Sequence, residues 1–215
     1  MKPTRGQIIT SILCLLPISL LGVFFFSDQL TANPIQALTL RTGRISIYLL
    51  LLTLLCSPIR YLTRFSALMP MRKTLGIFSF FYALTHFLVF IILDFQLQWD
   101  WIRQEIGFKP FLQIGLLAVI ILFLLASTSF RGIQKNLGKK WAAIHKLIYP
   151  AVGLVIVHVF LASKGDYSFP ILLFILYSIL MTARILPIEN KQIKELPSFF
   201  HMLNKFLLGQ PKWVK

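Results

Sequence analysis

Two histidines, His86 and His158, stand deep inside long apolar stretches of this 215-residue sequence. Ionisable side chains within a membrane span are costly to bury, face the protein interior and usually have a functional partner. Each histidine follows the expected start of its helix, Leu75 or Leu147, by 11 residues, which is about 16 Å of helix. Because both helices are expected to run in the same direction, the sequence predicts two imidazoles at matched depth, able to hold one metal from opposite faces.

The number of available ligands narrows the kind of metal. Zinc needs three or four donors from Cys, His or carboxylate groups, and neither stretch contains an acid or a thiol near this depth. A haem brings four nitrogens of its own, so two imidazoles and an apolar pocket are enough. The pair is therefore consistent with a b-type haem. Interhelical hydrogen bonding and a proton path are the alternatives at this point.

A third histidine, His145, lies at the mouth of the fifth apolar stretch, 13 residues before His158. In a continuous helix, 13 steps place the two imidazoles roughly 220° apart, so they do not share a face. Pro150 lies between them and can kink the helix or mark its true start, which would turn His145 toward the interior. The alternative is an ordinary interfacial histidine beside Lys146. The fourth histidine, His201, is expected to be solvated.

Six apolar stretches must position these residues. With 57% apolar residues, 13% charged residues and a mean hydropathy of +0.76, the composition is typical of a membrane protein, since soluble domains have about one charged residue in four. A hydrocarbon layer of about 30 Å takes about 20 helical residues. We therefore expect an all-α fold, a polytopic bundle of six transmembrane helices in residues 1–183, with a haem held between the third and fifth helices. The expected spans are residues 7–26, 42–59, 75–93, 111–130, 147–163 and 167–183.

Charge is distributed unevenly between the connecting segments. Of 22 Lys and Arg, 17 fall in the N-terminus, in loops 60–74 and 131–146 and in the tail, and such residues are retained on the cytoplasmic side. Both termini are therefore expected to be cytoplasmic, and residues 184–215 to form a basic amphipathic tail. The net charge of +15 indicates anionic membrane lipid rather than nucleic acid, because no charge-rich groove remains to bind it. The two cysteines lie inside apolar stretches and provide neither a disulfide framework nor a CxxC site.

Several short motifs occur in an order and spacing that make a family resemblance specific. They are TGR at 42–44, SPIRYL at 57–62, RKTLGIFSFFYALTH ending at His86, TS at 128–129 and LGKKWAAIH ending at His145, followed by His158. Over about residues 41–183 the chain resembles the haem-binding membrane subunits of bacterial protein-methionine-sulfoxide reductase systems, within the ferric-reductase-like transmembrane superfamily.

The resemblance implies that His86, His145 and His158 are haem ligands, with His86 and His158 the natural pair for a haem b toward the periplasmic side. The wider superfamily carries two histidines on each of the third and fifth helices and holds two haems. This chain has Lys73 at the position 13 residues before His86, so a second haem at His145 would lack a histidine partner. The resemblance also implies FMN, for which no local signature is present.

The resemblance further implies an electron-transfer subunit of an oxidoreductase complex, not its catalytic subunit. No GxGxxG or P-loop motif and no flavin domain are present, so electrons must come from membrane quinol or a cytoplasmic flavin reductase. They would cross the bacterial inner membrane to a periplasmic molybdopterin-containing methionine-sulfoxide reductase, which supports repair of oxidised proteins. The alternative is a proton-coupled small-molecule transporter with His86 and His158 as a proton relay, although no internal repeat is visible in the sequence.

Overall fold

The chain folds into helices throughout the residues that the computed structural model describes, 3–185 and 198–209. This all-helical architecture confirms the predicted fold class in its coarse form. The elements are α1 (Arg5–Phe26), α2 (Pro34–Thr63), α3 (Leu68–Leu88), the π-helix η1 (Val89–Asp94), α4 (Trp99–Phe108), α5 (Pro110–Ser127), α6 (Arg131–Leu137), α7 (Lys139–His145), α8 (Ile148–Ala162), α9 (Ser168–Ile185) and α10 (Ser198–Leu208).

Five helical segments of the described chain are long and apolar enough to cross a membrane. They are α1, α2, α3 together with η1, α5, and the segment from α7 through α8. The sixth predicted span corresponds to α9, which falls among the shorter apolar helices. The chain is therefore a membrane protein with five candidate spans, and the predicted count of six stays a prediction.

The second and third helices are longer than the sequence predicted. α2 has 30 residues and begins at Pro34, directly after Asn33, whose side chain accepts a hydrogen bond from the Gln36 N–H at 3.1 Å. α3 begins at Leu68, seven residues before its predicted start. Apolar composition marks only the part of a helix that lies in hydrocarbon, whereas capping residues determine where the helix itself begins.

The fifth predicted span, residues 147–163, corresponds to α8, and a break separates it from the short helix that carries His145. α7 ends at His145, and α8 starts at Ile148. Pro150 occupies the first turn of α8, where an N–H has no partner within the helix and its loss costs little. The proline therefore marks the start of a new helix, and the angle expected for a continuous helix does not apply to His145 and His158.

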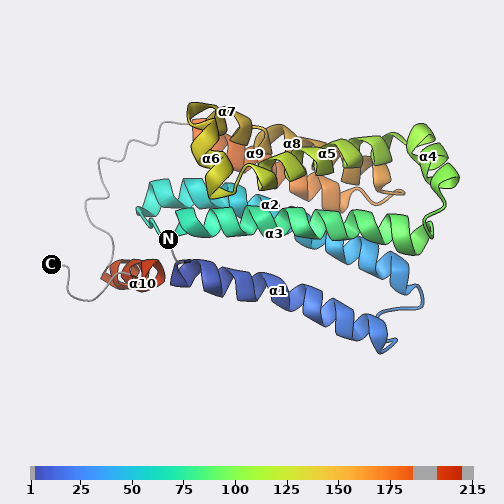
Figure 1. The fold of residues 1–215 in the computed structure, drawn as a ribbon, viewed down its shortest axis with the longest axis horizontal. Helices are drawn as coiled ribbons and strands as arrows, with labels where there is room; N and C mark the ends of the chain where they lie inside the picture. Colours follow the sequence, from blue (N-terminus) through green and yellow to red (C-terminus); the bar gives the residue numbers. More distant parts are fainter. Residues whose placement is uncertain (1–2, 186–197, 210–215) are drawn as a thin grey trace.

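α2, α3, α5, α8 and α9 share one buried apolar core, and α1 lies along the outside of α3 (Figure 1). The contact between α1 and α3 is fixed by Tyr82, whose hydroxyl donates to the Cys14 carbonyl at 2.7 Å and accepts from the Ile18 N–H at 3.0 Å. Large apolar side chains of α1, α5 and α9 remain exposed, as expected for surfaces that face lipid. The largest fully buried core side chains include Ile47, Leu50, Leu54, Val152 and Leu173.

The two ends of the bundle differ in charge. The start of α1, the α2–α3 turn, α6, α7 and α10 gather at one end, here called the basic end (Figure 1). α4 and the α8–α9 loop lie at the other, the acidic end, which contains all five acids of the described residues. They are Asp28, Asp94, Asp100, Glu105 and Asp166. The Ser168 hydroxyl and N–H both donate to Asp166, which lowers the pKa of this carboxyl below its usual value.

The tail predicted as amphipathic forms α10 over its described part, and residues 186–197 and 210–215 lie outside the described residues. α10 packs on the α2–α3 turn through Leu207, which is buried against Phe65 and Ala67. The Asn204 side-chain oxygen accepts a hydrogen bond from the Ala67 N–H at 2.8 Å. His201 on the same helix is exposed, as its predicted solvation requires.

Candidate functional site

The rings of His86 on α3 and His158 on α8 meet inside the bundle. Their centroids are 6.2 Å apart, and their planes are nearly perpendicular, at 87°. His86 lies 18 residues after the start of α3 and His158 lies 10 residues after the start of α8, so the equal separation of 11 residues from the helix starts is not observed. The structure thus brings these two predicted site residues together from two different helices.

Each ring of the pair is held by a main-chain carbonyl of a neighbouring helix. His86 Nδ1 lies 2.8 Å from the Thr39 carbonyl oxygen, and His158 Nδ1 lies 2.7 Å from that of Phe111. Because a carbonyl only accepts, Nδ1 must carry the proton in both rings. This leaves the Nε2 lone pairs, which no described residue engages, as the atoms able to bind a metal.

Two glycines let the rings approach the neighbouring helices. A Cβ at Gly43 of α2 would lie 3.1 Å from His86 Nδ1, and a Cβ at Gly115 of α5 would lie 2.7 Å from His158 Nδ1. The second distance is shorter than a non-bonded contact allows, and the first is tight. Only glycine therefore leaves the His158 ring in its observed position.

The two halves of the site repeat the same spacing. Each histidine follows the residue whose carbonyl it contacts by 47 positions, and it follows its glycine by 43. The offset of 72 positions that relates His86 to His158 also relates Lys73 to His145. The pair α2–α3 and the pair α5–α8 therefore form two repeats. Because α2 and α5 run in one direction and α3 and α8 in the other, the two repeats have the same orientation along the bundle.

This repeat was not predicted from the sequence, and neither were the four residues that contact the rings, Thr39, Gly43, Phe111 and Gly115. Thr39 and Phe111 have unrelated side chains and contribute only a main-chain carbonyl. This role requires no particular residue type, so it cannot be recognised in the sequence. The equal glycine-to-histidine separation of 43 residues is the signal that could have found the repeat.

The separation of the two rings suits a single metal between them. A metal–nitrogen bond of about 2 Å on each side, with each ring centre roughly 1 Å beyond its nitrogen, gives about 6 Å between centroids. The observed 6.2 Å agrees with this value. Since no group of three or more Cys, His, Asp or Glu side chains gathers in the described chain, the donor set fits a cofactor that supplies the remaining ligands itself.

His145 lies apart from the pair, near the basic end. Its ring packs on Trp141 with centroids 4.1 Å apart, and its Nδ1 lies 3.2 Å from the Trp141 carbonyl oxygen. Its Nε2 lies 3.3 Å from the Ser129 hydroxyl, while the Trp141 indole donates to the Thr128 carbonyl at 3.1 Å. The TS and LGKKWAAIH motifs therefore pack against each other, and both ring nitrogens of His145 already have a protein partner.

A network of arginines extends through the bundle near the basic end. The Arg72 guanidinium donates to the Ser57 hydroxyl at 3.0 Å. Arg184 of α9 donates to the Tyr149 hydroxyl at 2.7 Å and also contacts the Leu54 carbonyl. The basic end is thus polar in its interior, in contrast to the apolar surroundings of the histidine pair.

The chain is similar in sequence to a family of membrane components and to several curated proteins. Residues 42–156 match the family described as ferric reductase like transmembrane component, a range that includes His86 and His145 and ends two residues before His158. The chain is 36% identical over 188 residues to the protein-methionine-sulfoxide reductase heme-binding subunit MsrQ of Rhodospirillum rubrum, covering 87% of this chain and 90% of the relative. It is 36% identical over 199 residues to that of Herminiimonas arsenicoxydans, covering 90% and 91%. For the subunit of Xanthomonas campestris pv. campestris the identity is 37% over 164 residues, covering 74% and 75%.

Proposed function

This chain belongs to the family of protein-methionine-sulfoxide reductase heme-binding subunits, and on that premise we propose that it is a membrane electron-transfer subunit of the cytochrome b type. The observation that supports the proposal most directly is the pair formed by His86 and His158. Their centroids are 6.2 Å apart, and both Nδ1 atoms are bound to main-chain carbonyls.

In this proposal His86 and His158 would hold a b-type haem through their Nε2 atoms, and the haem would supply a one-electron carrier. The Thr39 and Phe111 carbonyls hold the protons on Nδ1 and fix the ring orientations, so both Nε2 atoms are positioned in advance to bind. The apolar helices around the pair exclude water and lower the local dielectric constant.

We place electron entry at the basic end and electron exit at the acidic end. The excess of Lys and Arg at the basic end supports a cytoplasmic location for that end, with both termini in the cytoplasm of a bacterial inner-membrane protein. The donor proposed there is membrane quinol or a cytoplasmic flavin reductase. The acceptor proposed at the acidic end is a periplasmic molybdopterin-containing methionine-sulfoxide reductase, which supports the repair of oxidised periplasmic proteins.

His145 has a separate role in this proposal, on the entry side of the molecule. Its counterpart in the repeat is Lys73, so the basic end lacks the second imidazole that the acidic end has. A second haem at His145 and an FMN cofactor remain proposals that rest on the family resemblance. Release of FMN on denaturation, followed by its fluorescence, tests the flavin.

The absorption spectrum of the protein purified in mild detergent tests the proposed function. Two imidazole ligands predict a reducible Soret band and the sharp visible bands of low-spin haem. We expect His86→Ala and His158→Ala each to remove most of this signal, and His201→Ala, an exposed histidine on α10, to leave it unchanged. Full haem content in both substituted proteins would overturn the ligand assignment, and a colourless wild-type protein would favour the proton-relay alternative.

A further inference from the structure

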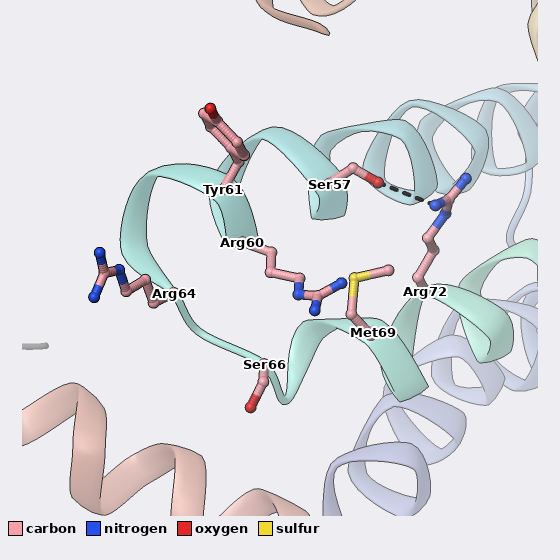
Figure 2. Close-up of a pocket in the computed structure, with 7 residues that line it drawn as sticks. All are labelled: Ser57, Arg60, Tyr61, Arg64, Ser66, Met69 and Arg72. Carbon is pink, nitrogen blue, oxygen red and sulfur yellow. Dashed lines mark hydrogen bonds between the residues drawn. The ribbon is translucent and has the colours of Figure 1, made fainter. Parts of the chain in front are cut away.

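A pocket of about 600 Å³ opens at the basic end, between the end of α2 and the start of α3. Pockets that bind small ligands have volumes of about 300–1,000 Å³. Three arginines, two serines, Tyr61 and Met69 line this one, and it shares none of the residues that hold the histidine pair. Figure 2 shows Arg60 extending from α2 toward Met69 and Arg72 extending from α3 to Ser57, with Arg64 at the edge and pointing away from both.

The charge in this pocket is not neutralised by the part of the chain that the structure describes. The ion pairs formed among the described residues, Arg103 with Asp100 and Lys109 with Glu105, both lie at the acidic end. Within the same residues, neither the Arg60 nor the Arg64 guanidinium makes a hydrogen bond. Arginines that line one pocket without a carboxylate among the described residues provide a site for an anion.

Arg72 is held in position without losing its capacity to bind an anion. One guanidinium nitrogen donates to the Ser57 hydroxyl at 3.0 Å, which is a neutral partner and leaves the positive charge in place. A guanidinium has five N–H donors, so most of those on Arg72 are not used by this bond. A fixed guanidinium with free donors is well suited to phosphate, which accepts two parallel hydrogen bonds from one arginine.

The depth of the pocket indicates where such a phosphate comes from. The 30 residues of α2 are about 45 Å long, and a bilayer with its headgroup regions measures about 40–45 Å. Arg60 and Arg64, at the end of α2, therefore lie at the level of the lipid headgroups. Tyr61 and Leu62 between them are 48% and 38% exposed, which is typical of side chains that face the membrane interface.

We propose that this pocket binds the phosphate group of an anionic ligand, and that this ligand is the headgroup of an anionic phospholipid. Basic pockets between transmembrane helices on the cytoplasmic side bind such headgroups. The pocket contacts the α2–α3 turn on which α10 packs, since Ser66 lines the pocket and receives a hydrogen bond from the Asn204 side chain. A bound lipid would thus link the turn, the tail helix and the membrane surface.

Native mass spectrometry of the full chain in detergent, titrated with phosphatidylglycerol, tests the proposal. We expect saturable binding of phosphatidylglycerol that is tighter than binding of phosphatidylcholine, whose phosphate is compensated by choline. Arg60→Gln/Arg72→Gln should weaken it roughly tenfold, because both charge-assisted contacts are lost. The matched control is Lys139→Gln/Lys140→Gln, which removes the same charge from exposed positions at the same end and should bind as the wild type does.

Two competitors distinguish the sources of the phosphate. Inorganic phosphate and FMN, at concentrations equal to that of the lipid, should not displace phosphatidylglycerol. Displacement by either would assign the pocket to a soluble phosphate compound and overturn the lipid assignment. Equal loss of binding in both double variants would show diffuse attraction and overturn the site itself. Melting curves show whether each variant is folded. If the double variant unfolds, the single variant Arg60→Gln, at an exposed position, replaces it in the binding measurement.

Discussion

At the position of Gly115, one added methyl group collides with a proposed ligand of the metal. Its Cβ would lie 2.7 Å from His158 Nδ1, so Gly115→Ala must displace the ring from the Phe111 carbonyl. We expect a roughly 10–100-fold loss of haem affinity, as for other lost partners of a metal-ligating histidine. Haem titration of the apoprotein measures it.

The control for this substitution lies on the same helix as His158. Gly153→Ala meets no atom within 4 Å and should leave haem affinity unchanged. Gly43→Ala should have an intermediate effect, because its Cβ would lie 3.1 Å from His86 Nδ1. Equal affinities for the Gly115 and Gly153 variants would show that the His158 ring is not confined.

A second prediction concerns the substitution of His145. Its contacts are with Trp141 and Ser129 and not with the other two histidines, so His145→Ala should leave the absorption spectrum of the proposed haem intact. If His145 acts in electron entry, the same variant should slow haem reduction by the physiological donor, while a membrane-permeant chemical reductant acts at the normal rate. Stopped-flow absorption with the two reductants measures the difference, and loss of colour would contradict the assignment.

The sequence alone indicated the two buried histidines but not what holds them. Burial of an imidazole in an apolar stretch is visible from composition, whereas the predicted equal distance from the helix starts is wrong, because α3 begins seven residues earlier than hydropathy indicates. The contacts with the Thr39 and Phe111 carbonyls cannot be predicted from residue type, because every residue has a carbonyl. The packing of α2 on α3 and of α5 on α8 determines which carbonyls the rings contact. The separate position of His145 likewise depends on the break between α7 and α8.

Among the elements, α4 is the part of the acidic end best placed to meet a partner protein. It is a helix of 10 residues with Ile102 buried beneath it, and Trp99 and Trp101 are 56% and 61% exposed. Replacing both Trp residues with Ala should reduce electron delivery to the catalytic partner and leave haem content unchanged, if they dock that partner.

The other role of these tryptophans is to anchor α4 at the membrane interface. An anchoring role predicts a lower membrane yield of the double variant with normal turnover per haem. Turnover per haem therefore distinguishes the two roles, and an unchanged value would exclude docking.

Besides the packing of Leu207, the helix α10 stabilises the turn at the basic end through the side chain of Asn204. Asn204 accepts from the Ala67 N–H at the start of α3, in the manner of a capping residue supplied by another helix. Asn204→Ala should lower the free energy of unfolding by about 1 kcal/mol. Thermal melting in detergent measures this, with His201→Ala on the same helix as control, and equal melting temperatures would contradict the contact.

Helix boundaries followed from the sequence only in part. The predicted end of the first span, residue 26, agrees with the end of α1, where the apolar run and the helix end together. α2 extends beyond the predicted span at both ends, since Asn33 and Pro34 begin it outside the hydrocarbon region. The α4 helix was missed because it lies between two spans and is too polar for a search based on hydropathy.

For the whole molecule, the charge difference between the ends predicts the orientation in the membrane. The N-terminus, Lys140 and the tail carry the basic excess, so reporters fused after Lys140 or at Lys215 should report the cytoplasm. Reporters near Asp100 or Asp166 should report the periplasm. Paired phosphatase and fluorescent-protein fusions measure the location of each site, and a periplasmic signal at Lys215 would contradict the orientation.

The 72-residue repeat has a consequence for how the proposed centre works. It gives both imidazoles the same kind of partner, a carbonyl four residues before a glycine on the adjacent helix. A metal held between them would therefore have the same kind of ligand on each side, and neither side would be distinguished by its ligand. The direction of net electron flow would then follow the difference in reduction potential between the proposed donor at the basic end and the proposed acceptor at the acidic end.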